Sequence, residues 1–477
     1  MYAEPRRLRA SSIAGILLGV AASAEPARAQ LECRPGGPQN YSFTVFPVAA
    51  SGEHLFTLHA SMNLFGAIVH REVLDSPNPR NACLVRRRAL GSSGFGGVQT
   101  LACGLTAEPG SFFNDLGEYP NVPLVDDRGT VYFFGRRSSD PRGIFRRTAG
   151  GPSPGELWVA HTGGRNDFTG AVGSIAVNPS RQVAYELSNI TGSTLFRADP
   201  GFAPIPLFLD FLASVLRGIG TDGSVWTLSS AGGAPLVTRT QVPLGGGPVT
   251  TTEWSFPGES VLDLNERGEM VTQSSEEQAW HRLSPGAAGM AIEGGVSGNA
   301  AVAGCGVWFL GSRRLCIGGS RDRGICEGFD DCNPTGSATT GFCSSDWKYG
   351  LYRWHTGTIQ PVLLEGDPVA GSTILFFGAG SSPLGAFERP VVANRAGQAL
   401  ASVRLADGRV VLVRADPPGA GVSFVRATGG TGDTCSYGFP VDDEQGVGAD
   451  GVPLLFGDPW SCEPPAPGGG QALAAAA

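Results

Sequence analysis

The chain has 477 residues, among them 71 glycines and 35 prolines, and 41% of its residues are hydrophobic while 16% are charged. So much Gly and Pro excludes a long-helix or coiled-coil protein, and the composition is too apolar for wholesale disorder. The formal net charge is −8, and Lys348 is the only lysine. An acidic chain lacks the basic surface that binds nucleic acid by counterion release, so we expect no nucleic-acid partner.

The first 29 residues have the layout of a secretory signal peptide. Three arginines precede an apolar run from Ile13 to Ala22, and Ala27-Arg28-Ala29 forms an A-x-A cleavage site. The apolar run is too short to cross a bilayer as a helix. We expect cleavage after Ala29 and a secreted, periplasmic or cell-surface protein. Later apolar runs stay below 18 residues, so we expect no transmembrane segment after cleavage.

The cysteine pattern indicates disulfides. All ten cysteines follow the predicted cleavage site, and an even number in an oxidising compartment allows up to five bridges. Zinc sites need paired C-x-x-C or Cys/His spacing, which this chain lacks. Local pairing is expected for Cys83 with Cys103 and for Cys435 with Cys462, and the other pairings stay open. The candidates are Cys33, Cys83, Cys103, Cys305, Cys316, Cys326, Cys332, Cys343, Cys435 and Cys462.

A turn of the form Asn/Asp-x-x-Gly, followed by a short β-rich run, recurs along the chain. Asn or Asp can bond its own backbone two residues on, and Gly supplies a positive φ, so each copy predicts a reversal into a strand. Clear copies begin at Asn63, Asp126, Asn265 and Asn394, and weaker ones lie at Asn178, Asp222, near Asn299 and at Asp450.

The repeat length predicts the fold. A second apolar run follows many of the turns and ends in arginine, at Arg146, Arg197, Arg353 and Arg414. The mean spacing of about 49 residues, with several short strands per unit, favours a β-propeller over helical or leucine-rich repeats. We predict an all-β propeller of about seven blades, between six and eight, over residues 30–462. N-terminal strands at 41–48 and 55–59 would complete the last unit, near Gly451, and remove its open edge.

A cysteine-rich insertion at 305–346 interrupts one unit and lacks apolar periodicity. It is therefore expected to be a loop held by disulfides rather than by a core. Carboxylate and amide oxygens in it could hold calcium, although EF-hand spacing is absent, and the same residues would also keep a loop hydrated. The tail, 463–477, is expected to be disordered. The candidate calcium ligands are Asp330, Asp331, Asn333 and Asp346.

One unit, residues 350–416, resembles a known group of proteins. It contains Glu365-Gly-Asp-Pro-Val-Ala-Gly371 and, later, Asn394-Arg-Ala-Gly397. This pattern is similar to an E-G-D-P-x-x-G … N-x-x-G signature of exported bacterial repeat proteins, which are propeller-like and mostly of unknown function. The other units keep only the N-x-x-G half. The resemblance therefore implies the fold and transfers no site.

Two short motifs match catalytic or cofactor-binding signatures, but the residues around them do not predict the structure that these signatures need. Gly151-Pro-Ser-Pro-Gly155 fits G-x-S-x-G, but its prolines indicate a surface turn rather than a nucleophile elbow. Gly446-Val-Gly-Ala-Asp-Gly451 fits G-x-G-x-x-G, yet an apolar strand pattern follows it where a dinucleotide site needs a helix. The histidines show no metal-binding spacing. They are His54, His59, His70, His161, His281 and His355.

Eight tryptophans are dispersed among the units, and we interpret most as packing residues. Trp347 and Trp354, which flank the insertion, are the best candidates for ligand contact. We expect a monomeric scaffold for binding or structure, without a resident cofactor unless calcium binds, and with an unknown protein or glycan as partner. The alternative is an exported enzyme acting on polysaccharide, with acidic residues from different blades in the central channel.

Overall fold

The computed structural model describes residues 41–417 except for several loops, of which the longest are 88–97, 105–112, 161–174, 333–340 and 379–390. The predicted signal peptide, the tail and the Cys435–Cys462 pair lie outside the described residues. Within these residues the regular structure is β-strand with one short 3-10 turn, and no helix is long and apolar enough to span a membrane. The described residues all belong to the unit Pro38–Ala477.

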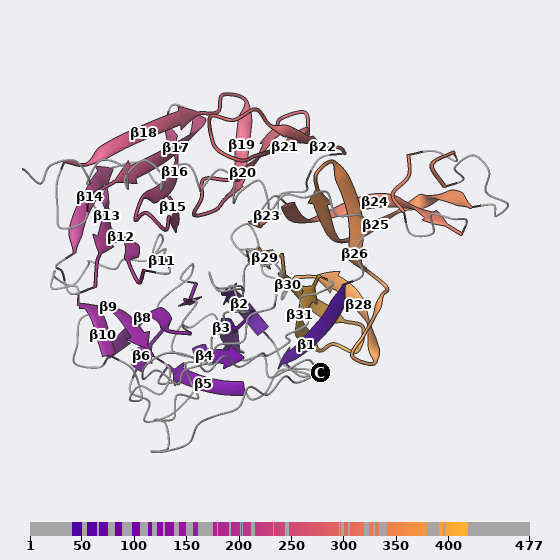
Figure 1. Cartoon of the computed structure of the whole chain (residues 1–477). Coiled ribbons are helices and arrows are strands. Elements are labelled where there is room, and N and C mark those ends of the chain that lie inside the picture. The colour runs from indigo at the N-terminus through magenta and orange to yellow at the C-terminus, as the bar shows by residue number, and fades with distance from the viewer. Residues whose placement is uncertain are drawn as a thin grey trace, which may run out of the picture. The chain divides into compact units, whose positions relative to one another are not determined.

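Seven antiparallel sheets follow one another around a ring, as the prediction of about seven blades required (Figure 1). In the five four-stranded sheets the inner strand comes first in the chain, and later strands lie successively farther out. Blade 1 contains β2 (Leu55–Met62), β3 (Ile68–Leu74), β4 (Ala82–Arg87) and β5 (Val98–Cys103); blade 2 contains β6 (Phe113–Asp115), β7 (Leu124–Val125), β8 (Val131–Arg137), β9 (Gly143–Arg147) and β10 (Glu156–Ala160); blade 3 contains β11 (Ile175–Val177), β12 (Val183–Asn189), β13 (Gly192–Ala198) and β14 (Ile205–Asp210).

The remaining blades repeat this order. Blade 4 contains β15 (Val215–Ile219), β16 (Val225–Ala231), β17 (Ala234–Gln241) and β18 (Thr250–Ser255); blade 5 contains β19 (Glu259–Leu264), β20 (Met270–Ser274), β21 (Ala279–Arg282) and β22 (Met290–Ile292); blade 6 contains β23 (Ala300–Ala303), β24 (Gly306–Ile317), β25 (Phe342–His355) and β26 (Thr358–Leu364); blade 7 contains β29 (Val391–Ala393), β30 (Ala399–Leu405), β31 (Val410–Asp416) and β1 (Ser42–Ala49), with β27 (Pro368–Val369) and β28 (Ser372–Phe377) beside β30. The chain is a seven-bladed β-propeller.

The N-terminal strand closes the ring. β1 pairs antiparallel with β31, from Ser42 opposite Asp416 to Ala49 opposite Val410. The inner strands also contact one another in sequence from β2 to β29, and β29 contacts β2. The predicted strand at 41–48 therefore closes the ring as β1, but it completes a sheet that ends at Asp416 and not a unit near Gly451. The other predicted strand, 55–59, belongs to the inner strand of blade 1.

Hydrophobic clusters fill the spaces between consecutive blades. Seven such clusters exist among the described residues, one for each pair of neighbouring blades, including the pair formed by blades 7 and 1. Between blades 1 and 2, for example, Val69 and Leu84 pack against Phe133 and Phe145. A four-stranded sheet cannot bury both of its faces alone, so each blade relies on its neighbours.

The recurring turn joins the first and second strands of a blade. In blade 1, Asn63 Oδ1 accepts a hydrogen bond from Ala67 N–H (2.9 Å), and Gly66 has a φ of 72°. A Cβ at Gly66 would also collide with the Arg414 guanidinium. Both the positive φ and the lack of space require glycine at this position. In blade 6 the corresponding turn lies between Ala303 and Gly306, so the weak copy near Asn299 precedes the first strand instead.

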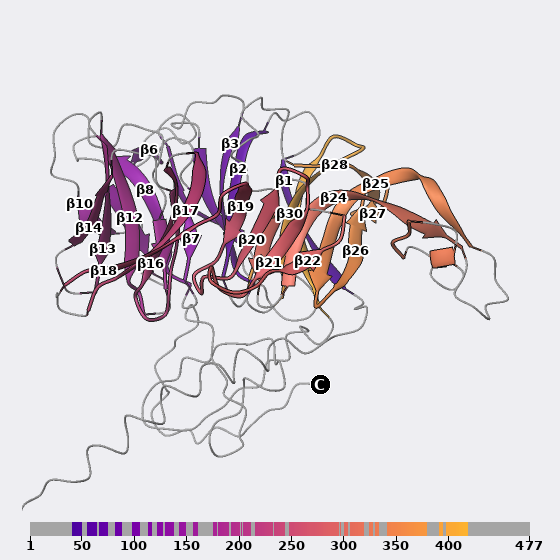
Figure 2. The same cartoon turned by 90° about the horizontal axis from the view of Figure 1, so that it is seen from above.

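The cysteine-rich segment is an extension of a blade hairpin. Residues 306–311 of β24 pair with 350–355 of β25 inside blade 6, and the ladder continues outward to Ile317 opposite Phe342. Figure 2 shows this hairpin projecting beyond the ring. We call residues 312–349 the arm. The first residues of the predicted insertion thus belong to the blade, where Trp308 and Phe309 are fully buried.

Candidate functional site

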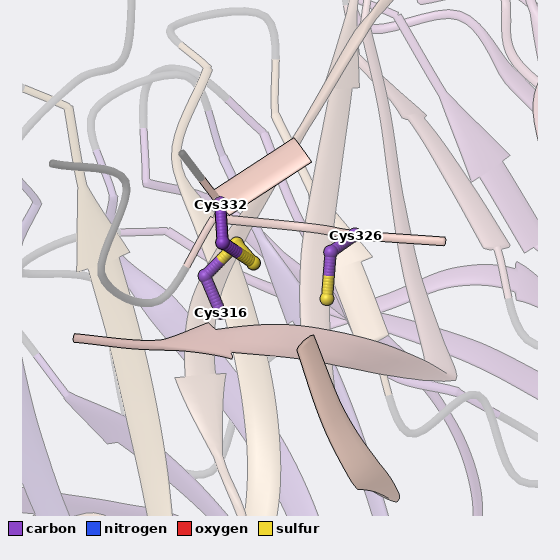
Figure 3. A group of neighbouring side chains, drawn as sticks. All are labelled: Cys316, Cys326 and Cys332. Atoms are coloured by element: carbon purple, nitrogen blue, oxygen red, sulfur yellow. A yellow bond between two sulfur atoms is a disulfide. The ribbon is translucent and has the colours of Figure 1, made fainter. Parts of the chain in front are cut away.

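Two disulfides hold the arm together. Cys316 bonds Cys332 (Figure 3), and Cys326 bonds Cys343. These four residues form a small cluster of their own. Cys316 and Cys343 are also opposite each other in the β24–β25 ladder. The expectation of a segment held by disulfides is confirmed, as is the pair Cys83–Cys103 in blade 1. The arm adds a strand ladder that the sequence did not indicate.

The cysteine cluster is not a thiolate metal centre in this structure. The sulfur atoms of Cys316, Cys326 and Cys332 all lie within 4.8 Å of one another. Each of the three is oxidised in a disulfide, and metal binding needs the thiolate. The close approach of the sulfurs therefore reflects two neighbouring bridges that replace an apolar core at the end of the hairpin.

The arm carries large apolar side chains that face solvent. Ile317 and Phe342 are opposite each other on the ladder, and their exposed fractions are 48% and 53%. Trp347, opposite Arg314, is 65% exposed, more than the other large exposed apolar side chains among the described residues. Folding does not bury these side chains, so their apolar surface remains available to a partner.

The root of the arm is fixed to the neighbouring blades. The Arg313 guanidinium lies over the Phe309 and Tyr352 rings at 5.3 and 5.9 Å, and burial lowers the pKa of Arg313. Its Nη2 donates to Glu293 O of blade 5 (3.4 Å). On the other side Tyr349 meets Phe377 of β28 edge-to-face at 6.1 Å. The arm is thus clamped between blades 5 and 7 at its base.

Of the four predicted calcium ligands, Asp331 and Asp346 have side-chain hydrogen bonds within the arm. Asp331, in the short 3-10 segment η2 (Asp330–Cys332), accepts a hydrogen bond at Oδ2 from Glu327 N–H (2.7 Å). Asp346 is exposed and accepts a hydrogen bond from Ser345 Oγ (3.4 Å). Asn333 lies outside the described residues. Calcium binding stays a prediction, and the contacts of Asp331 fit a structural role.

The two candidate tryptophans have opposite environments. Trp347 is the exposed residue of the arm, whereas Trp354 is 1% exposed and belongs to the core between blades 5 and 6. The Trp354 ring lies 5.3 Å from the imidazole of His281, which is also fully buried. Such burial leaves no face of Trp354 for a ligand and fits the packing interpretation. Trp347 remains the candidate for contact.

The same kind of polar network occurs twice. One copy joins blade 7 to blade 1, and the other joins blade 3 to blade 4. In blade 7, Gln398 Nε2 and Arg414 Nη2 both donate to the carboxylate of Asp416. Arg414 Nη1 then reaches Gly66 O of blade 1 at 2.9 Å. In blade 3 the equivalent residues are Gln182, Arg197 and Asp199, and Arg197 Nη1 reaches Gly223 O of blade 4 at 3.1 Å. These side chains are buried and hold consecutive blades together.

Arg414 and Arg197 occupy the same position in their blades. Each lies on the third strand of the blade, opposite the second residue of the second strand. Blades 5 and 6 depart from the pattern, because His281 and Trp354 occupy this position there. The shorter imidazole packs against Trp354 with the ring planes tilted by 58°, and neither ring nitrogen of His281 has a hydrogen-bond partner in this structure. Burial, together with the nearby His355, lowers the pKa of His281 to about 4. The position is occupied by Arg86, Arg146, Arg197, Arg239 and Arg414 in blades 1, 2, 3, 4 and 7.

Two other polar clusters at blade contacts are structural. In blade 6 the Arg353 guanidinium lies over the Tyr41 and Trp308 rings, at 5.9 and 5.6 Å, and these two rings meet edge-to-face. The contacts tie the chain just before β1 to this blade. In blade 1 the fully buried His70 accepts a hydrogen bond from Arg87 Nε (3.1 Å). Burial and the Arg87 charge lower the pKa of His70 to about 3.

Three carboxylates of the inner strands and turns already have structural partners. Asp126 accepts hydrogen bonds from Thr130 N–H (2.7 Å) and Tyr132 Oη (3.4 Å). Asp263 Oδ2 accepts Val302 N–H of the next blade (3.0 Å), and Glu259 pairs with Arg282 (3.1 Å). Each of these groups therefore joins backbone or side-chain groups of the propeller.

The E-G-D-P signature forms the turn that leaves blade 6. Asp367 Oδ2 accepts Leu364 N–H (2.9 Å), Gly366 has a φ of 90°, and Gly366 N–H donates to Ile374 O (2.9 Å). The aspartate and glycine thereby shape the start of the β27–β28 hairpin. Burial raises the pKa of Glu365, and the positive charge of Lys348 partly offsets this rise.

The comparisons with known proteins add a fold likeness only. No protein-family model matches the chain, and no curated protein matches it. Solved propellers are similar to it at low identity and with TM-scores below 0.5, and these matches carry no functional argument. They include virginiamycin B lyase from Staphylococcus aureus (9% identity, TM-score 0.38, 78% of this chain and 99% of that one), prolyl oligopeptidase B from Galerina marginata (8%, 0.41, 81% and 50%) and the Aleuria aurantia lectin AAL (11%, 0.31, 66% and 97%).

Proposed function

We propose that the chain is an exported binding scaffold, in which the propeller holds the arm of blade 6 toward a protein or glycan partner. The observation that carries this proposal is the arm itself. It presents Trp347, Phe342 and Ile317 to solvent on a hairpin that two disulfides and the Arg313 contacts keep in one shape. A rigid apolar element loses little conformational entropy on binding.

The polar residues of the described blades support a scaffold over a catalyst. The buried side chains of Arg197, Arg414 and Asn394 bond to neighbouring blades. Gln and Asp side chains hold the two arginines within their own blades. Export is the second part of the proposal, with residues 1–29 as its signal peptide. The three disulfides within the described residues support an oxidising compartment, where such bridges persist.

The test is a combined glycan and protein binding array, with a panel of polysaccharide hydrolase substrates run alongside. Wild-type chain is compared with Trp347→Ala and Phe342→Ala. Phe202→Ala and Leu283→Ala are matched controls, because Phe202 and Leu283 are also large, exposed and apolar but lie outside the arm. The proposal expects a bound partner whose affinity falls at least tenfold in the arm variants alone. Substrate turnover without arm-dependent binding would contradict it.

A further inference from the structure

Among the described residues, the strand that covers one edge of β25 inside the blade ends at the base of the arm. β26 pairs with β25 over residues 350–355, and at the end of this ladder Glu365 N–H donates to Tyr349 O (3.0 Å). The chain then turns away at Gly366. Among the described residues, no strand pairs with the same side of β25 between Phe342 and Lys348. We call this stretch the open edge.

At Trp347 the backbone of the open edge is oriented for a further strand. Peptide groups of residues two apart point to the same side of a strand, so the Trp347 peptide groups point as the Tyr349 carbonyl does, away from β24. A register shift of the β24–β25 ladder separates Trp347 from Cys343. The other edge of the arm is already covered, because Cys316 N–H donates to Gly324 O (2.8 Å) and Cys326 N–H donates to Arg314 O (3.1 Å). The two edges of the hairpin therefore differ.

The exposed side chains lie on both faces of this edge. Phe342 is opposite Ile317 and Trp347 is opposite Arg314, and Arg314 and Ile317 point to opposite faces because they are three residues apart. A strand added at the edge would present side chains to both faces at once. A flat surface such as a membrane would contact one face. Asp346 and Lys348 flank Trp347, so the edge has no net charge to attract a polyanion.

We propose that the open edge binds an extended peptide segment of another protein, which adds a strand to β25. The inference rests on the proposed function of the arm and specifies its partner. Main-chain hydrogen bonds to β25 give affinity, and alternate side chains of the peptide contact Trp347 on one face and Phe342 on the other. The partner chemistry is thus an extended segment with apolar residues at alternating positions.

The test uses a phage-displayed library of linear 12-residue peptides selected on the full chain. Selected peptides are synthesised, and their affinities are measured for wild type, Trp347→Ala, Phe342→Ala and the control Phe202→Ala. Each peptide is then N-methylated at one position after another. Strand addition predicts losses of at least tenfold at every second position, at least tenfold loss in both arm variants, and less than twofold change in the control.

The possible failures are distinct. Arm-dependent peptides whose N-methylation scan lacks a two-residue period would overturn strand addition, while the arm would remain a binding element. Selection of no arm-dependent peptide, together with an arm-dependent glycan on the array, would overturn it in the same way. A dimer of the chain that needs Trp347 would also overturn it, because the occupant would then be a second copy. Loss of arm dependence in every assay would remove the proposed function as well.

Discussion

Asn394 Nδ2 donates a hydrogen bond to the backbone carbonyl oxygen of Asn63 at 2.8 Å, although the two residues are 331 positions apart. Asn63 Nδ2 in turn donates to Asp126 O (2.9 Å), and Asn178 Nδ2 donates to Gly220 O (2.8 Å). Asn63, Asn178 and Asn394 therefore each have two roles. The side-chain oxygen shapes its own hairpin, and the side-chain nitrogen holds the next blade.

Replacing Asn394 by Ala is expected to weaken the closure between blades 7 and 1. The change removes the hydrogen bond that the Asn63 carbonyl oxygen accepts, and also the hydrogen bond that Gln398 N–H donates in the turn. We therefore expect a loss of about 1–3 kcal/mol in the free energy of unfolding. Equilibrium urea unfolding measures it. Asn265→Ala is the control, since Asn265 Nδ2 bonds Glu269 of its own blade. Equal losses in both variants would argue against a role in closure.

Asp416→Ala tests the buried network of blade 7. It leaves the Arg414 guanidinium buried without its carboxylate, and removing one partner of a buried pair costs about 3–5 kcal/mol. Asp407→Ala is the comparison, because the Asp407–Arg409 pair (2.6 Å) is at the surface and should leave the urea midpoint unchanged. Similar midpoints for the two variants would contradict the assignment of Arg414 and Asp416 to blade closure.

Acid should destabilise the propeller through its buried histidines. The folded-state pKa of His281 is lowered to about 4, so between its ordinary pKa of 6.5 and about 4 the unfolded chain binds more protons. The free energy of unfolding therefore falls as the pH is lowered through this window, with a slope of at most about 1.4 kcal/mol per pH unit from one group.

His281→Leu should remove this part of the pH dependence, because leucine carries no proton to bind. Unfolding free energies at pH 7 and pH 5 give the comparison with wild type. His70 continues to contribute in the variant, since its folded-state pKa is lowered to about 3. A variant with the same loss between pH 7 and 5 as wild type would show that His281 is not responsible.

Removing the Cys326–Cys343 bridge should affect the arm and spare the ring. These residues lie outside the interblade clusters, so Cys326→Ser with Cys343→Ser should keep the melting temperature of the propeller and make residues 318–341 susceptible to limited proteolysis. The Cys83–Cys103 double serine variant is the contrast, since that bridge joins β4 and β5 inside blade 1. Loss of the whole cooperative transition in the arm variant would refute this division.

The sequence predicts the ring because the turn chemistry is local. Asn63, Asp126, Asn265 and Asn394 can be recognised from Asx and Gly preferences alone, and their spacing gives the number of blades. Cys83 and Cys103 could be paired because they lie 20 residues apart in one unit. The recurrent arginines were visible as a pattern, yet their bonds to the next blade depend on register, which a single sequence does not specify.

The arm was harder to predict for a physical reason. Its ladder is held by two disulfides and lacks a core, so residues 312–349 show no apolar alternation that would reveal strands. No sequence pattern therefore marks Phe342 and Ile317, although each is about half exposed. Trp347 and Trp354 looked alike in sequence, and only the position of Trp354 on the blade face, seven residues farther along β25, separates a core residue from an exposed one.

The most direct test of the account is deletion of the arm. Gly311 and Gly350 are opposite each other in the ladder, so residues 312–349 can be replaced by an Asn-Gly hairpin turn that keeps the strands of the blade and removes the contacts of Arg313 and Tyr349 to blades 5 and 7. The binding array and thermal unfolding are then repeated on this variant. The account predicts an intact cooperative unfolding transition and loss of the partner bound by wild type. Retention of that partner by the armless propeller would contradict it.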